Sequence, residues 1–271
     1  MEILGFNINV EHFKSKDYLI ECLRFIDLTS LNATDTNIRI EGIVSKINDF
    51  PKRFPELPNV AAICAYPSFT GVMKKHLTAK DVQIAVTGAG FPASQTFLKT
   101  KVQECKMAVE KGADEVDIVM SLNHFLSGEY ALVVDEISAI KEAIGGARLK
   151  VILESGALPS VESIAQASRI VMGAGADFIK TSTGKSEPAA TPEAAVVMCN
   201  EILTFYQKTG KRVGLKPAGG IVLTNEALVY YAIVHKILGL EWLTPTLFRI
   251  GASRLVNNLL SEIYHIETIY F

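Results

Sequence analysis

The sequence predicts a single (β/α)8 barrel, and three observations support this fold class. Eight short apolar runs with strand character recur along the chain, and each ends in a polar, reactive or glycine-rich segment. Longer segments with helical spacing separate the runs, which predicts parallel strands joined by right-handed crossovers. The 271 residues, of which 49% are hydrophobic, are enough for one large core. Eight repeated units favour a closed barrel over an open doubly wound sheet.

The runs expected as strands are residues 24–28, 60–65, 82–87, 115–120, 149–154, 177–181, 213–216 and 247–250. The clearest helix follows the third run. It is expected to begin at Ser94 as N-cap and to end at Gly112, with Lys101 among its polar positions. Residues 1–20 are expected to form a short N-terminal helical extension, and residues 264–271 a C-terminal tail. No linker or composition break divides residues 1–271, so one domain is expected.

The composition argues against several kinds of partner and cofactor. A formal net charge of −2, with lysines and glutamates interspersed, predicts no binding to nucleic acid or to a membrane. We find no signal-peptide pattern and no apolar stretch long enough to span a bilayer. The cysteines show no paired spacing, which favours a reducing, cytoplasmic location. No group of His, Cys and Asp residues has ligand spacing, so neither a metal nor another cofactor is expected.

In a barrel of this class the active site lies at the carboxyl ends of the strands. The residues at those ends are Asp27, Cys64, Thr87, Asp117, Glu154, Lys180, Lys216 and Gly251. Carboxylates and lysines that meet at one mouth predict a catalytic site there.

Lys180 and Lys216 end consecutive predicted strands, which lie about 4.8 Å apart in a sheet. An unperturbed lysine with a pKa of about 10.4 is neutral only about once in 2,500 at pH 7. A neighbouring cation and burial lower that pKa, and the neutral amine can form a Schiff base with a carbonyl group. A shift to about 7 costs about 4.6 kcal/mol. The alternative is that each lysine simply extends into water.

Asp117 lies between Val116 and Ile118 in an otherwise apolar run. A carboxylate in such a strand needs a partner. It either neutralises one of the lysines or serves as a proton relay for a substrate hydroxyl.

Glycine-rich turns after the last three predicted strands indicate a phosphate site, because glycines let backbone N–H groups approach an anion. The turns are Thr183-Gly184-Lys185, Gly219-Gly220 and Gly251-Ala252-Ser253. Residues 88–93 also fit the dinucleotide-binding pattern G-x-G-x-x-A. We disfavour that function because the helix is expected to start after the glycines rather than within them.

Several segments together resemble the deoxyribose-phosphate aldolase family, from about residue 25 to residue 253. The most specific are FIKTSTGK and GLKPAGG, supported by FIDLTSLNATDT, AAICAYP, GADEVDIVM, LKVILESG and FRIGAS. The resemblance implies a cofactor-free aldolase of deoxynucleoside breakdown that cleaves 2-deoxyribose 5-phosphate into glyceraldehyde 3-phosphate and acetaldehyde. Lys180 would form the Schiff base, and Lys216 would perturb it and join Asp117 in a proton relay.

The resemblance also implies which residues bind the substrate. Those that would hold the phosphate are Thr183, Lys185, Gly219, Gly220, Gly251 and Ser253. Asp27 and Cys64 match mouth positions that would shape the site. Two positions depart from the family pattern. Val222 stands where an arginine is common, and Arg254 stands where Ser or Thr is common, so Arg254 either restores the cation or is a surface residue.

The tail ends in Tyr270 and Phe271. These aromatic side chains either pack on the surface or in the interface of a homo-oligomer, or a mobile tail brings the Tyr270 hydroxyl to the enamine as a proton donor, as the resemblance implies. Two alternative functions stay open: a Schiff-base barrel for another phosphorylated sugar, and a non-catalytic barrel that binds a phosphorylated metabolite.

Overall fold

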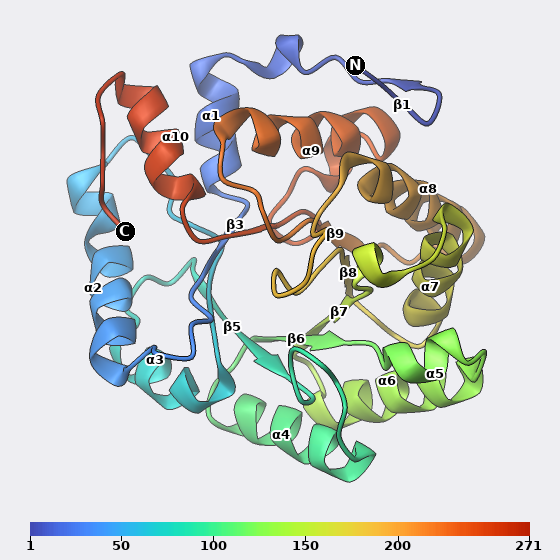
Figure 1. Cartoon of the computed structure of the whole chain (residues 1–271). Coiled ribbons are helices and arrows are strands. Elements are labelled where there is room, and N and C mark those ends of the chain that lie inside the picture. The colour runs from blue at the N-terminus through green and yellow to red at the C-terminus, as the bar shows by residue number, and fades with distance from the viewer.

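In the computed structural model, which describes residues 1–271, eight parallel strands form a barrel with helices around it (Figure 1). The strands are β3 (Ile26–Thr29), β4 (Ala62–Ala65), β5 (Gln83–Gly88), β6 (Glu115–Val119), β7 (Arg148–Ile152), β8 (Phe178–Lys180), β9 (Gly214–Lys216) and β10 (Ile250–Ala252). Each strand from β3 to β8 pairs with the next one in the chain, and β10 pairs with β3. The predicted (β/α)8 class is confirmed.

The barrel closes between β9 and β10 through single contacts rather than a continuous ladder. Two isolated bridges join Leu215 to Phe248 and Ala218 to Gly251. The Arg249 N–H donates to the Leu215 carbonyl at 3.0 Å. The strand predicted over residues 247–250 therefore begins later than expected. Residues 247–249 make only the isolated contacts with β9, and the continuous ladder with β3 starts at Ile250.

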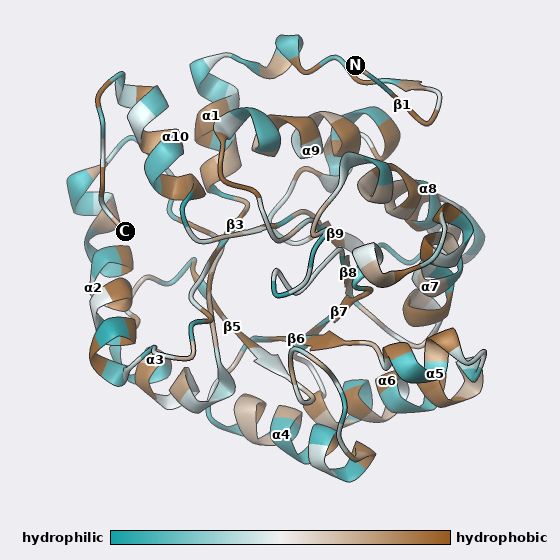
Figure 2. Ribbon diagram, in the orientation of Figure 1, coloured by the Kyte–Doolittle hydropathy of each residue, from teal (hydrophilic) through white to brown (hydrophobic).

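Ten α-helices accompany the strands. They are α1 (Lys16–Leu23), α2 (Asn37–Arg53), α3 (Thr70–His76), α4 (Leu98–Glu110), α5 (Leu122–Leu126), α6 (Tyr130–Ile144), α7 (Val161–Gly173), α8 (Pro192–Thr209), α9 (Thr224–Ile237) and α10 (Leu255–Tyr264). Figure 2 shows helices with both hydrophilic and hydrophobic faces, and the large apolar core includes side chains from the strands and the helices around them. No helix combines the length and the apolar character that crossing a bilayer requires.

Local sequence signals explain where α8 begins and ends. The Thr191 side chain accepts a hydrogen bond from the Ala194 N–H, and Pro192 occupies the first turn, where its missing N–H is not needed. Gly210 ends the helix with a φ of 71°, a conformation that glycine adopts at little cost. These signals place the loop that follows β8 directly before a well-defined helix.

The predicted start of the helix after β5 was wrong. Ser94 is not a cap: it has a φ of 56°, and its hydroxyl accepts a hydrogen bond from the buried Lys101 ammonium at 2.9 Å. The helix α4 starts only at Leu98. In the same loop the Gly90 N–H already donates to Glu104, which leaves this donor unavailable to a dinucleotide phosphate.

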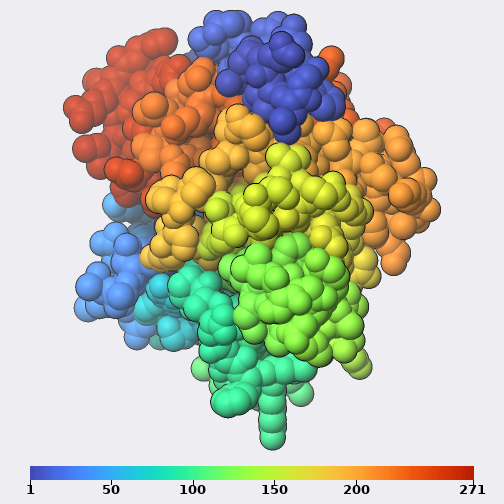
Figure 3. Space-filling model, turned by 45° about the vertical axis from the view of Figure 1, so that its right-hand side comes forward, coloured from blue at the N-terminus to red at the C-terminus, as the bar shows by residue number.

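The N-terminal extension is helical only in its second half. An antiparallel pair, β1 (Glu2–Ile3) and β2 (Phe6–Asn7), comes first, followed by a 3-10 turn, η1 (Glu11–Phe13), and α1. Phe13 packs against Tyr231 of α9 with ring centroids 5.1 Å apart. Figure 3 shows the extension, in blue, lying against the orange C-terminal part of the barrel.

Candidate active site

The interior of the barrel contains charged side chains where many barrels of this class contain branched apolar ones. Seven of them are buried almost completely: Asp27, Glu115, Asp117, Lys150, Lys180, Lys216 and Arg249. We call these seven side chains the ion cluster. The facing strands β4 and β5 supply the small residues Ala62, Cys64 and Ala85, which form a separate apolar cluster. The short side chains of β4 and β5 thus leave space inside the barrel for the long lysine side chains of β7, β8 and β9.

Asp117 on β6 is the carboxylate that connects the lysines. Its Oδ2 atom accepts hydrogen bonds from Lys180 Nζ at 2.8 Å and from Lys216 Nζ at 2.7 Å. Its Oδ1 atom accepts one from Lys150 Nζ at 3.0 Å. Lys180 and Lys216 are opposite each other in the β8–β9 register. The structure therefore brings together the three residues that the sequence singled out for chemistry.

The rest of the ion cluster was missed by the sequence analysis, apart from Asp27. Arg249 contacts Asp27 Oδ1 at 2.5 Å and Glu115 Oε1 at 2.7 Å. Lys150 contacts Glu115 at 2.5 Å, and Lys216 contacts Asp27 at 2.5 Å. A charged residue between apolar neighbours, as in Leu149-Lys150-Val151, is the same signal that identified Asp117, and it could have identified Lys150.

Burial and neighbouring charges give the lysines different acidities. Burial lowers the pKa of Lys180 below its ordinary value; Asp117 opposes this shift and the charge on Lys216 adds to it. Burial also acts to lower the pKa of Lys216, but Asp117 and Asp27 outweigh it and raise that pKa. Lys216 therefore stays cationic while Lys180 loses its proton more readily. The sequence analysis proposed a neighbouring cation and burial as causes, and burial is the larger.

A cavity of about 720 Å³ opens at the carboxyl ends of the strands. Lys180 lines it, whereas the other six members of the ion cluster do not. The charged side chains in its lining are all cationic: Arg39, Lys46, Lys180, Lys185 and Arg254. No aspartate or glutamate side chain lines it, so its charge favours an anionic ligand.

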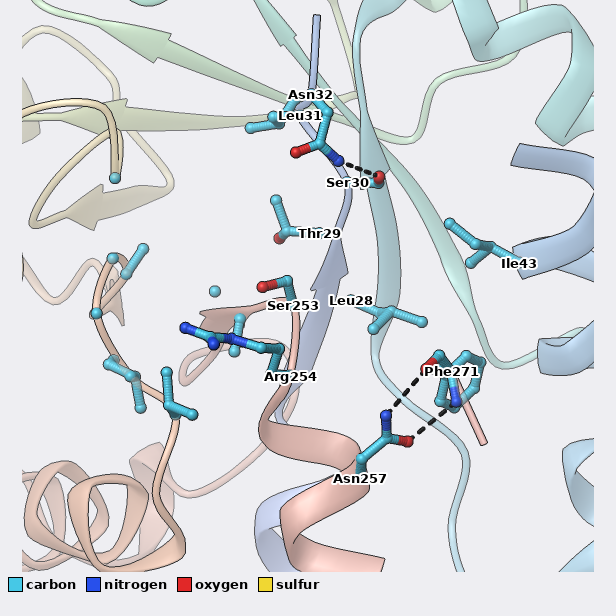
Figure 4. A pocket seen from close by; sticks show the side chains of 18 of the residues that line it. Leu28, Thr29, Ser30, Leu31, Asn32, Ile43, Ser253, Arg254, Asn257 and Phe271 are labelled. Atoms are coloured by element: carbon cyan, nitrogen blue, oxygen red, sulfur yellow. Dashed lines mark hydrogen bonds between the residues drawn. The ribbon is translucent and has the colours of Figure 1, made fainter. Parts of the chain in front are cut away.

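All six residues expected to hold the phosphate line this cavity: Thr183, Lys185, Gly219, Gly220, Gly251 and Ser253. Gly219 and Gly220 have φ values of 90° and 78°, which favour glycine. Arg254 also lines the cavity, beside Ser253 and just before α10 (Figure 4). Helix N-termini attract anions, so this position suits a phosphate group.

Asp27 and Cys64 differ from their expected place at the mouth. Both are fully buried, and neither lines the cavity. Asp27 belongs to the ion cluster, and Cys64 lies in the small apolar cluster. Since each lies on an inward-facing strand position below the strand end, the side chain points into the barrel instead of the opening.

The tail packs along α2 and α10. The Tyr270 hydroxyl donates to the Lys46 carbonyl at 2.8 Å, and its ring packs against Phe50. The Asn257 side chain bonds the backbone of Tyr270 and Phe271, as Figure 4 shows for Phe271. Phe271 lines the cavity and Tyr270 does not. In this conformation Tyr270 bonds the Lys46 carbonyl and lies outside the cavity that Lys180 lines.

No group of three or more His, Cys, Asp or Glu side chains is arranged to hold a metal ion. The fold and the site define a (β/α)8-barrel protein with a cation-lined cavity beside a buried lysine of lowered pKa.

A family model described as DeoC/LacD family aldolase matches residues 22–236, and the chain belongs to this family. Over 259 residues the chain is 41% identical to the deoxyribose-phosphate aldolases of Homo sapiens and Bos taurus, which covers 92% of this chain and 81% of each relative. It also resembles a solved structure described as the unique tetrameric structure of deoxyribose phosphate aldolase from Aeropyrum pernix. That match has a TM-score of 0.68 at 25% identity and covers 93% of this chain and 94% of the other.

The charges around Lys180 predict opposite pH shifts for two variants. Only the neutral amine attacks an aldehyde, so the rate of borohydride trapping with acetaldehyde should rise with pH until Lys180 is deprotonated. Lys216→Leu removes a cation that lowers the pKa of Lys180, so the midpoint should move to higher pH. Asp117→Asn removes an anion that raises it, so the midpoint should move to lower pH. We expect shifts of about one unit or more.

The exposed Lys211→Leu serves as the control, because Lys211 precedes β9 at the opposite end of the barrel. Its midpoint should equal that of the parent. Shifts of the same sign in Lys216→Leu and Asp117→Asn would contradict the electrostatic explanation.

Proposed function

We propose that this aldolase cleaves 2-deoxy-D-ribose 5-phosphate into D-glyceraldehyde 3-phosphate and acetaldehyde through a Schiff base on Lys180. The observation that carries the proposal is that Lys180 alone of the ion cluster lines a cavity whose charged side chains are all cationic. The names of the human and bovine relatives support the choice of substrate.

The first step needs an unprotonated amine and an aldehyde. Lys180 Nζ attacks C1 of the open-chain sugar, and loss of water gives an iminium ion. The iminium accepts the electron pair of the C2–C3 bond as that bond breaks, which forms an enamine and an aldehyde. Burial of Lys180 provides the unprotonated amine at lower pH than an exposed lysine would.

The second requirement is a group that takes the proton of the C3 hydroxyl. Asp117 Oδ2 is 2.8 Å from Lys180 Nζ, so it lies next to the carbon chain once the imine has formed. Lys216 shares the same oxygen at 2.7 Å. We assign Asp117 and Lys216 to the relay, through a water molecule, that takes this proton and later returns one to the enamine.

We assign the substrate phosphate to the part of the cavity lined by the glycine-rich loops and the start of α10. Backbone N–H groups near Gly219 and Gly220, the N-terminal turn of α10 and the side chains of Lys185 and Ser253 supply donors there. Arg254 adds a cation where Val222 offers none. We propose that Arg254 takes over the charge that other family members place after the glycine pair.

We also propose that the protein is a homo-oligomer and that it is cytoplasmic. A tetrameric relative suggests that this chain also forms a homo-oligomer, which light scattering of the purified protein would test. Four buried cysteines without disulfides fit a reducing compartment, and we propose the cytoplasm, which a fluorescent fusion would test.

The proposed reaction predicts its products and the site of a covalent label. The purified protein should convert 2-deoxyribose 5-phosphate into glyceraldehyde 3-phosphate and acetaldehyde, detected by coupled dehydrogenase assays. Borohydride with acetaldehyde should inactivate it and fix an ethyl group on Lys180, located by peptide mass mapping. A label on Lys216 or Lys185 would contradict the assignment, and a different product pair would contradict the substrate.

Chelators should leave the rate unchanged, since an iminium can act as the electron sink that a metal ion provides in other aldolases. Loss of activity with EDTA and its recovery with zinc would contradict the mechanism.

Arg254→Ala should raise the KM for 2-deoxyribose 5-phosphate about tenfold, because a charge-assisted contact to the phosphate is lost. The KM for unphosphorylated 2-deoxyribose should stay the same. Arg212→Ala is the control, because Arg212 precedes β9 at the other end of the barrel and pairs with Glu241. Equal effects of Arg254→Ala on the two sugars would mean that Arg254 does not contact the phosphate.

Tyr270→Phe separates the two roles left open for the tail. The family resemblance suggests a proton donor, which would require the tail to leave α2, whereas the contact with the Lys46 carbonyl fits packing. We expect the variant to exchange deuterium into the methyl group of acetaldehyde at the parent's rate, as followed by NMR. Slow exchange with intact Schiff-base formation would instead establish the relay role.

A further inference from the structure

Glu154, which follows β7, is a buried carboxylate without a cationic partner. The residue is only 5% exposed, and no lysine, arginine or histidine nitrogen forms an ion pair with it. Both of its oxygens instead face Thr183: Oε1 accepts from the Thr183 N–H at 3.0 Å, and Oε2 accepts from the Thr183 hydroxyl at 2.6 Å. Burying a carboxylate without a cationic partner costs free energy. We therefore look for the function of Glu154 in its two hydrogen bonds with Thr183.

These contacts fix the polarity of the Thr183 hydroxyl. Its one proton is donated to Glu154, so the hydroxyl has only lone pairs left. One lone pair accepts the Lys185 N–H at 3.0 Å. Thr183 lines the cavity, and toward a ligand its oxygen can therefore only accept a hydrogen bond.

The backbone around Glu154 also supports the loop after β8. Glu154 has a φ of 50° and a ψ of 58°, a left-handed conformation that a residue with a side chain keeps only when its surroundings enforce it. The Ser155 N–H donates to the Thr181 carbonyl at 2.9 Å. Gly156 lies so close to this loop that a Cβ atom there would be 1.9 Å from the Pro188 carbonyl oxygen. Residues 154–156 thus pack against residues 181–188 and hydrogen-bond to them.

We propose that Glu154 is a positioning residue that makes the Thr183 hydroxyl a hydrogen-bond acceptor for a hydroxyl group of the substrate. The inference rests on the proposed function, since it needs a hydroxylated sugar as ligand. It also changes the expected role of Thr183, which the sequence analysis placed among the phosphate ligands. The dianion of a phosphate monoester has only acceptor oxygens, so it cannot bond to an oxygen that can only accept.

Glu154→Gln tests this role because it keeps the shape and changes the polarity. The glutamine amide can accept only one of the two Thr183 hydrogens, and its NH2 group can donate to the hydroxyl. At pH 8 we expect the KM for 2-deoxyribose 5-phosphate to rise about tenfold, with kcat within about threefold of the parent. Trapping of acetaldehyde on Lys180 should persist. The inhibition constant of methyl phosphate, a monoester dianion without an O–H donor, should stay within about twofold, because its binding does not use the Thr183 hydroxyl.

Thr183→Val removes the hydroxyl, and the double variant with Glu154→Gln should be no worse than Thr183→Val alone. Glu104→Gln is the matched control, since Glu104 likewise anchors a loop backbone, through the Gly90 N–H, but bonds no residue that lines the cavity. It should keep the parent's KM. If Glu154→Gln fails to fold, Thr183→Val must still raise the KM while Thr183→Ser does not.

The parent's turnover in the same assay tests the proposed function, and the ratio of variant to parent tests the role of Glu154. An unchanged KM in Glu154→Gln overturns the inference. A parallel rise in the KM and in the inhibition constant of methyl phosphate also overturns it, because that would mean general damage to the loop. Independent, multiplying effects of Glu154→Gln and Thr183→Val would also overturn it.

Discussion

The carboxylate of Asp117 holds three lysines from three different strands, and the charge balance inside the barrel depends on it. Burying charges is costly unless each one is paired and hydrogen-bonded, and removing one partner leaves an uncompensated charge. Three buried carboxylates, Asp27, Glu115 and Asp117, face three buried cations that share them, Lys150, Lys216 and Arg249. Lys180 is then a fourth cation. Its neutral form balances this set, which agrees with its lowered pKa.

The strand geometry decides which of these groups can meet a substrate. Lys180 and Lys216 end β8 and β9 in register, but only Lys180 lines the cavity, since Lys216 is held between Asp27 and Asp117. Asp117 and Lys150 occur earlier on their strands and stay sealed below the floor. Within the ion cluster, Lys180 is thus the one side chain that reaches the cavity, and Asp117 and Lys216 lie directly behind it, within hydrogen-bond distance.

The sequence predicted the barrel and four members of the ion cluster: apolar neighbours made Asp117, Lys180 and Lys216 conspicuous, and Asp27 was expected at a strand end. It could not reveal most partners, because pairing joins residues far apart: Arg249 bonds Glu115 across 134 positions. The start of α4 was mispredicted because a tertiary contact replaced the expected helix cap. The Ser94 hydroxyl accepts a hydrogen bond from Lys101 instead of capping the helix. The contact of the Glu154 carboxylate was hidden for the same reason, since its partner Thr183 lies in the loop after the next strand.

A barrel interior filled with ion pairs also affects how stability varies with temperature. Exposing apolar surface on unfolding raises the heat capacity, whereas exposing polar surface lowers it. The interior side chains Asp27, Glu115, Lys150 and Arg249 therefore contribute little to the curvature of the stability curve, which comes mainly from the apolar layer between sheet and helices. The desolvation penalty of paired charges also falls on heating. On warming, the ion pairs at the centre of the barrel consequently lose less of their contribution to the free energy of unfolding than aliphatic side chains of equal volume would.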